Sequence, residues 1–187
     1  MELRVLGCLI EKQRTTPDQY PLSLNALRLA CNQSTSRDPV VDYDEGTIRA
    51  ALDRLGDRGW TRLASGPGSR AAKFRHLLDD ALQLTPSQLA VLAVLMLRGP
   101  QTVAELRTRS ERLYPFSSVE DVTATLNGLA GRELVAEGAR HRWVQLLGET
   151  GAPQPVAQTG GGLEDRVEQL ERELEEIRER LAALESA

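Results

Sequence analysis

The chain has 187 residues, of which 41% are hydrophobic, 27% charged and only 4% aromatic. This length suits one or two hydrophobic cores, built mainly from Leu, Val and Ala. The longest apolar run, residues 89–97, is too short to cross a bilayer, and the chain opens on charged residues without a signal-peptide core. We therefore expect a cytoplasmic protein that does not contact a membrane.

The formal net charge of −4 is unevenly distributed. Residues 1–78, called the first half below, carry 12 Lys and Arg against 9 Asp and Glu, a charge of +3. Residues 79–148, the second half, carry −1, and residues 149–187 carry −6. A mildly basic first half is compatible with nucleic-acid binding but does not establish it.

Three helices are predicted in the first half. Apolar residues are dense from Glu2 to Gln13, which predicts a buried first helix. Ser23 is the expected N-cap of a second helix, and Asp44 that of a third helix ending at Gly59. Cys8 and Cys31 occupy apolar helical positions, so we expect buried, reduced thiols rather than a disulfide.

A two-stranded ribbon is predicted after the third helix. Residues 60–64 and 71–77 are typical of strands, and the glycine-rich residues 65–69 predict the turn between them. Three helices followed by such a hairpin are typical of a winged helix.

The second half repeats this order. Thr85 and the following proline predict the start of a helix that ends at Gly99. Thr102 is the expected cap of a helix reaching Leu113, and Ser118 is expected to form a capping box at the third helix. Residues 134–136 and 143–146 predict a second ribbon.

The repeat predicts a mainly α fold with small β-wings: two tandem winged-helix domains, residues 1–78 and 79–148. Residues 149–162 are rich in Gly, Pro, Gln and Thr and predict a flexible linker. Residues 163–187 carry a heptad pattern and predict a coiled-coil helix. The expected dimerisation residues occupy its a and d positions: Leu163, Val167, Leu170, Leu174, Ile177, Leu181 and Leu184.

The charges beside these heptads favour a parallel homodimer. In a parallel pair Arg166 faces Glu171, Glu173 faces Arg178, and Arg180 faces Glu185. Each exposed pair contributes only about 0.2–1 kcal/mol. Packing of this stripe on the protein's own globular part is the alternative.

Several runs of residues resemble a known family. They are residues 4–12, Thr15 to Leu27, Ala30 to Gln33, Arg37 to Val40, and Leu97 to Thr102 with Glu105 to Arg109. These runs resemble the YceH-like bacterial proteins over about residues 2–147. The resemblance implies a tandem winged-helix fold and little about activity.

The residue patterns of common enzyme sites are missing from the sequence. The two histidines, His76 and His141, lie in separate ribbons, and no Cys or His pair has the spacing of metal ligands. There is no nucleophile elbow, and residues 66–69 lack the lysine of a phosphate-binding loop. We expect no catalytic site, metal or cofactor.

Duplex DNA is the expected partner, because a winged helix usually places its third helix in the major groove. The candidate DNA contacts lie on the third helix, before it and on the wing of the first half. They are Arg37, Thr47, Arg49, Arg54, Arg70, Lys73 and Arg75. As a cluster these residues fit base and phosphate contacts, although each arginine alone is typical of a solubilising surface residue.

Carboxylates at the start of the third helix oppose this interpretation. Asp42, Asp44 and Glu45 would repel phosphates, and Glu120 and Asp121 stand at the same place in the second half. The leading hypothesis is therefore a transcriptional regulator that binds DNA through its first half only. The alternative is a non-enzymatic adaptor whose winged helices dock a protein partner.

Overall fold

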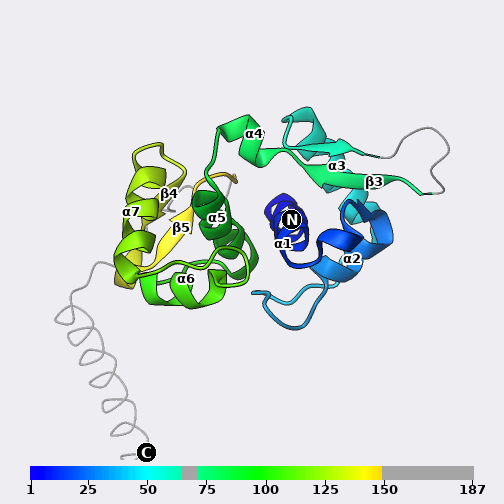
Figure 1. Cartoon of the computed structure of the whole chain (residues 1–187). Helices are drawn as coiled ribbons and strands as arrows, with labels where there is room; N and C mark the ends of the chain where they lie inside the picture. Colours follow the sequence, from blue (N-terminus) through cyan, green and yellow to red (C-terminus); the bar gives the residue numbers. More distant parts are fainter. Residues whose placement is uncertain (65–70, 149–187) are drawn as a thin grey trace, which may run out of the picture. The chain divides into compact units, whose positions relative to one another are not determined.

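The computed structural model describes residues 1–64 and 71–148. Within them the protein is mainly helical, with two small antiparallel sheets (Figure 1). The predicted turn at 65–69, Arg70, the linker at 149–162 and the heptads at 163–187 lie outside the described residues. None of the helices in the two described ranges has the length and apolar content needed to span a bilayer.

Each half contains three main helices and then two strands. The first half comprises α1 (Glu2–Thr15), the 3-10 turn η1 (Pro17–Gln19), β1 (Leu22–Ser23), α2 (Leu24–Cys31), α3 (Glu45–Asp57), β2 (Thr61–Leu63) and β3 (Lys73–His76). The short helix α4 (Leu78–Leu82) joins the halves. The second half comprises α5 (Pro86–Arg98), α6 (Val103–Ser110), α7 (Val119–Ala130), β4 (Val135–Glu137), the 3-10 turn η2 (Ala139–His141) and β5 (Trp143–Gln145).

Local capping explains where most of these helices begin. The predicted N-caps of α2, α3, α5 and α6 are confirmed, each accepting a backbone hydrogen bond at 2.7–3.3 Å: Ser23, Asp44, Thr85 and Thr102. Ser118 also caps α7, but the predicted capping box is wrong, because the Asp121 carboxylate accepts from the Ser117 hydroxyl instead.

The prediction that α6 reaches Leu113 is wrong. The helix ends at Ser110, whose carbonyl accepts hydrogen bonds from the amides of Leu113 and Tyr114 in a closing turn. Pro115 follows, and the residue before a proline is disfavoured in helical conformation. The first helix runs two residues further than predicted, to Thr15, whose hydroxyl donates to the Glu11 carbonyl.

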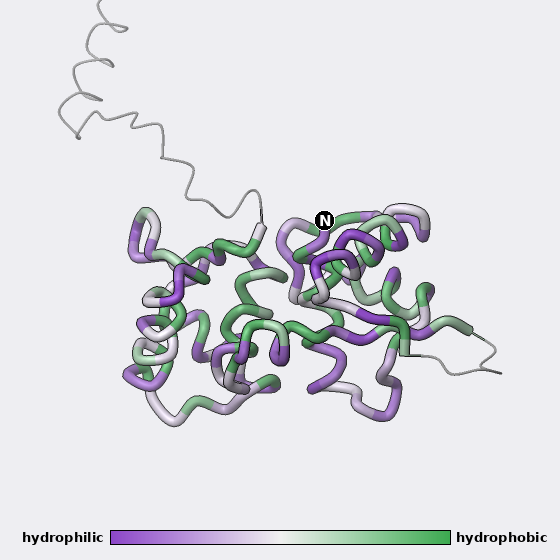
Figure 2. Tube along the Cα trace, turned by 90° about the horizontal axis from the view of Figure 1, so that it is seen from above, coloured by the Kyte–Doolittle hydropathy of each residue, from purple (hydrophilic) through white to green (hydrophobic). Residues whose placement is uncertain are grey.

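Helices α1 and α5 pack against each other and join the two halves in one compact unit (Figure 1). Residues Leu89 to Leu97 of α5 are all buried, as is the middle of α1. One continuous core contains residues of both halves, and the most hydrophobic segments lie toward the middle of this unit (Figure 2). The division at residues 78 and 79 therefore remains a prediction about domains.

Gly7 sets how closely α1 approaches α5. A Cβ atom added there would lie 3.0 Å from Cγ of Leu97 and 3.1 Å from Cβ of Met96. Because the Cβ of Met96 is fixed to the α5 backbone, it can move only with the helix. Glycine therefore permits the contact that brings the two halves together.

The first-half sheet has three strands, not the two that were predicted. Its order is β1-β3-β2, with both pairs antiparallel. Strand β1 was not predicted, because two residues are too few to show alternation. In the second half, Gln101 forms an isolated bridge with Trp143 of β5, at the position that corresponds to β1.

Candidate nucleic-acid interface

Three cations lie on the outward face of the β2–β3 ribbon. Arg62 pairs with Arg75 in the register, and Lys73 lies two residues before Arg75, on the same face. The opposite face points into the protein, where Thr61 and His76 are 4% and 3% exposed. We call Arg62, Lys73 and Arg75 the basic sheet face.

The basic sheet face is electrostatically unpaired. Side chains directly opposite one another in an antiparallel pair have Cβ atoms about 5 Å apart, and like charges in that position destabilise the sheet. None of the three cations has a carboxylate partner among the described residues, and the buried Nε of Arg75 has no hydrogen-bond acceptor. A phosphate between the exposed ends of Arg62 and Arg75 would relieve this repulsion.

Helix α3 offers less positive charge than its sequence suggests. Arg54 forms a salt bridge with Glu2, and Arg58 lies 3.9 Å from the same carboxylate. Arg49 is exposed and has no ion-pair partner in the part of the chain that the structure describes. Asp53 and Asp57 are also exposed on α3.

Thr47 contributes to the cap of α3. It is half-buried, and its backbone amide donates to Oδ1 of Asp44 at 2.7 Å. Hydrogen bonds from the Thr47 amide and side chain lower the pKa of Asp44 below its ordinary value. The carboxylate at the start of α3 therefore stays charged, at the helix end that was expected to enter a groove.

The prediction that Arg37 contacts a DNA phosphate is wrong in this structure. Its side chain is fully buried and forms a salt bridge with Glu11 of α1, at 2.5 Å from Nη2 to Oε2. Its other donors are satisfied by the carbonyls of Ala30 and Ser36 and by Oε1 of Gln33, at 2.9–3.0 Å. Arg37 thus holds the loop after α2 against α1.

The pKa of Arg37 reflects this pairing. Burial is the largest influence and opposes the charged form, but the hydrogen bonds with Glu11 and the electrostatic interactions with Cys8, Glu11 and Cys31 together outweigh it and raise the pKa above its ordinary value. The guanidinium therefore keeps its charge inside the protein.

His76 lies beneath the basic sheet face, on the inner side of β3. Its Nε2 is 2.7 Å from Oε1 of Gln13, and its Nδ1 is 3.5 Å from Oδ1 of Asp79 without a hydrogen bond. Burial lowers the pKa of His76 below its ordinary value. No group of three His, Cys, Asp or Glu side chains is placed to hold a metal within the described residues.

The buried His76 predicts a loss of stability on mild acidification. Its pKa is lowered in the folded state, so below about pH 6.5 the unfolded chain binds the extra proton first, and the free energy of unfolding falls. We expect urea midpoints to decrease between pH 7.5 and pH 5.5. His76→Gln should reduce this decrease, whereas the exposed His141→Gln should not; equal pH dependence in all three proteins would contradict this account.

The second half lacks a basic sheet face. In the β4–β5 ribbon Val135 and Trp143 face inward, and the outward pair is Ala136 opposite Val144. Arg142 is bound to Glu105, at 2.8 Å from Nη1 to Oε2, whereas Arg140 is exposed in η2. Only the first half therefore presents unpaired cations on the outward face of its ribbon.

Lys73 and Arg75 were predicted to contact DNA from the wing, and both lie on the basic sheet face, whereas Arg62 was not predicted. A usable signal existed, because side chains alternate along a strand and Arg62 follows the inward Thr61 in the predicted strand. The pairing that sets it opposite Arg75 also depends on β3, so the sequence of β2 alone does not specify it. Arg70 lies outside the described residues, so its role remains a prediction.

The protein is thus a mainly helical chain with two small antiparallel sheets, one of which carries the basic face. A family model described as "Protein of unknown function, DUF480" matches residues 1–142. The chain is 46% identical to a UPF0502 protein of Pelobacter propionicus, with 98% of this chain and 91% of that protein covered. It is 40% identical to a UPF0502 protein of Pectobacterium carotovorum, with 98% and 95% covered.

The chain belongs to this family, the DUF480 proteins, which includes the YceH-like relatives expected from the sequence.

Proposed function

We propose that this protein binds double-stranded DNA through its first half, with each half forming a winged helix. The element order supports this fold, because in each half three helices precede an antiparallel ribbon, and β1 adds a third strand to the first ribbon. The observation that carries the function is the basic sheet face, where Arg62 and Arg75 stand opposite each other without a carboxylate. Phosphate contacts of this kind give affinity without reading sequence.

The proposed contact differs from the usual one for a winged helix. Exposed carboxylates on α3, among them Asp53 and Asp57, disfavour deep entry of that helix between phosphates. The ribbon would instead lie along the DNA backbone, and Arg49 would be the contact from α3. The heptads at 163–187 are proposed to pair two chains in parallel, which would give two such ribbons per dimer.

Removing the two opposed arginines tests the DNA contact. Arg62→Gln with Arg75→Gln should weaken binding to any duplex about tenfold or more in low salt, since two phosphate contacts are lost. Fluorescence anisotropy with a labelled duplex of arbitrary sequence measures this loss.

Arg140→Gln is the matched control, because Arg140 is exposed near the ribbon of the second half. It should leave DNA affinity unchanged. Equal affinities for the wild-type protein and the double variant would contradict the proposal.

A protein-docking adaptor is the second candidate function. The exposed carboxylates of α3 and the neutral outward pair of the β4–β5 ribbon favour it, because they suit a protein partner better than a phosphate backbone. Absence of duplex binding at low salt, together with recovery of one partner protein from nuclease-treated extract, would favour the adaptor.

A further inference from the structure

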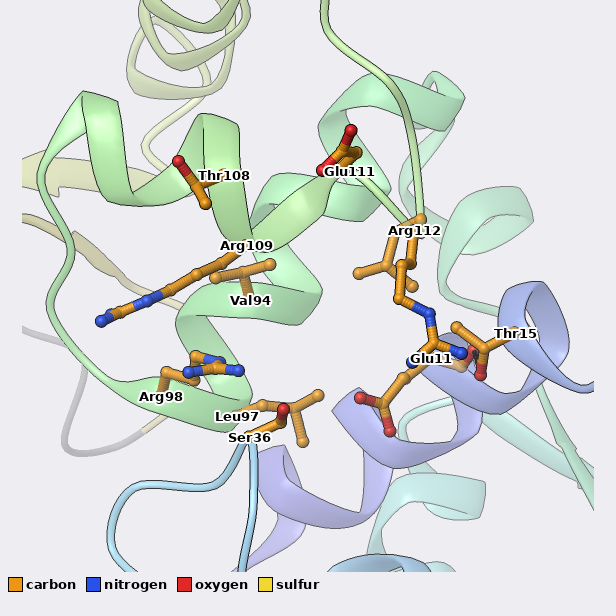
Figure 3. Close-up of a pocket in the computed structure, with 11 residues that line it drawn as sticks. Glu11, Thr15, Ser36, Val94, Leu97, Arg98, Thr108, Arg109, Glu111 and Arg112 are labelled. Atoms are coloured by element: carbon orange, nitrogen blue, oxygen red, sulfur yellow. Dashed lines mark hydrogen bonds between the residues drawn. The ribbon is translucent and has the colours of Figure 1, made fainter.

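A pocket of about 330 Å³ opens between the two halves, away from the basic sheet face. Its walls come from α1, the loop after α2, α5, and α6 with the turn that follows it (Figure 3). Val94 and Leu97, each 3% exposed overall, contribute an apolar floor. The pocket is therefore lined by side chains of both halves and belongs to neither alone.

Arginines stand on two sides of this floor. Arg98 and Arg109 lie together on one side, and Arg112 extends from the other (Figure 3). The Arg109 side chain donates a hydrogen bond to Oε1 of Gln101. It also forms a salt bridge with Glu105, at 3.5 Å from Nη2 to Oε1. The guanidinium groups of Arg98 and Arg112 have no hydrogen bond or ion pair with any described residue.

The charge inside the pocket is not balanced by its own carboxylates. Glu11 lines the pocket, but its carboxylate already forms a salt bridge with the buried Arg37. Glu111 is exposed and forms no ion pair within the described ranges. Burial first, and then the neighbouring Arg109 and Arg37, lower the pKa of Arg98 by more than Glu11 raises it.

We propose that this pocket binds a small organic carboxylate with an apolar body. The carboxylate would accept hydrogen bonds from Arg98 or Arg112, because guanidinium groups match carboxylates in shape and charge. The apolar body would lie on Val94 and Leu97. The occupant would contact both α1 and α6, and so both halves of the protein.

Benzoate is a suitable probe, and benzamide is its uncharged equivalent. We expect saturable benzoate binding to the full-length protein by ligand-observed NMR or calorimetry, and much weaker binding of benzamide. Arg98→Gln and Arg112→Gln together should weaken benzoate binding by at least about tenfold, the loss typical of charged hydrogen bonds. Arg140→Gln should not change it.

Thermal melting separates loss of the site from loss of the fold. The side chains of Arg98 and Arg112 have no hydrogen bond or ion pair with a described residue, so the double variant should melt no lower than the wild type without ligand. Benzoate should stabilise the wild type more than the double variant. Absence of benzoate binding, unchanged binding in the double variant, or equal binding of inorganic phosphate would overturn the proposal. These measurements contain no DNA, so their failure leaves the proposed DNA contact standing.

Discussion

Arg37→Ala should destabilise the protein by about 3 kcal/mol, the low end of the loss seen when one partner of a buried ion pair is removed. The substitution deletes a fully buried guanidinium and leaves Glu11, 18% exposed, without its cation. It also removes the donors that serve the Ala30 carbonyl and the Gln33 amide oxygen. Urea unfolding followed by the fluorescence of Trp60 and Trp143 measures the loss.

A double variant distinguishes the ion pair from simple packing. Arg37→Met with Glu11→Leu replaces both charges by apolar groups and should recover most of the lost free energy, because no charge is then left unpaired. Arg49→Ala is the control, since Arg49 is exposed and has no ion pair in the described structure, and it should cost less than about 0.5 kcal/mol. A cost for Arg37→Ala as small as that of Arg49→Ala would contradict the structural role.

Gly7→Leu should cost about 3 kcal/mol, at the upper end of the typical overpacking range. The added side chain must occupy space that Leu97 and Met96 already fill, since even a Cβ would lie 3.0–3.1 Å from them. The clash would separate α1 from α5 and weaken the contact that joins the two halves. Thermal unfolding should report a lower midpoint for this variant.

A matched glycine and a double-mutant cycle make this prediction specific. Gly56, also helical, has no atom within 4 Å of a Cβ added there, so Gly56→Leu should be neutral or slightly stabilising. Leu97→Ala opens space beside Gly7, so its combination with Gly7→Leu should cost less than the two single changes added. If the losses in unfolding free energy were additive, or if Gly7→Leu and Gly56→Leu had equal effects, the close approach of α1 to α5 at Gly7 would not explain the destabilisation.

Local features of the fold could be predicted from the sequence. Ser23, Asp44, Thr85 and Thr102 begin helices where predicted, because a cap needs only an acceptor and an amide three residues away. The helices and the strand ribbon of each half were likewise predicted from the spacing of apolar residues. The short elements β1 and α4 were missed, because two and five residues carry too little pattern.

The candidate site was harder to predict, because its charges depend on distant partners. Arg37 was predicted to be free to contact DNA, yet its partner Glu11 lies on α1, 26 residues earlier. Arg54 is likewise paired with Glu2, across 52 residues. Arg62 belongs to the basic sheet face because the strand register sets it opposite Arg75. The candidate cations are therefore evident in the sequence, but which of them have carboxylate partners is decided by the tertiary fold.

The two halves share an element order but differ in their surface chemistry. The outward pair of the first ribbon is Arg62 and Arg75, whereas that of the second ribbon is Ala136 and Val144. The second half instead contributes α5 to the common core and Arg98 to the pocket between the halves. Because of this difference, the proposed DNA contact is placed on the first half alone.

The salt dependence of DNA affinity tests the basic sheet face most directly. The logarithm of the association constant should fall linearly with the logarithm of salt concentration, because each neutralised phosphate releases counterions. We predict that Arg62→Gln with Arg75→Gln makes this slope shallower by about 2, roughly one for each lost phosphate contact. A slope identical to that of the wild-type protein, or no duplex binding by the wild type at low salt, would contradict the account.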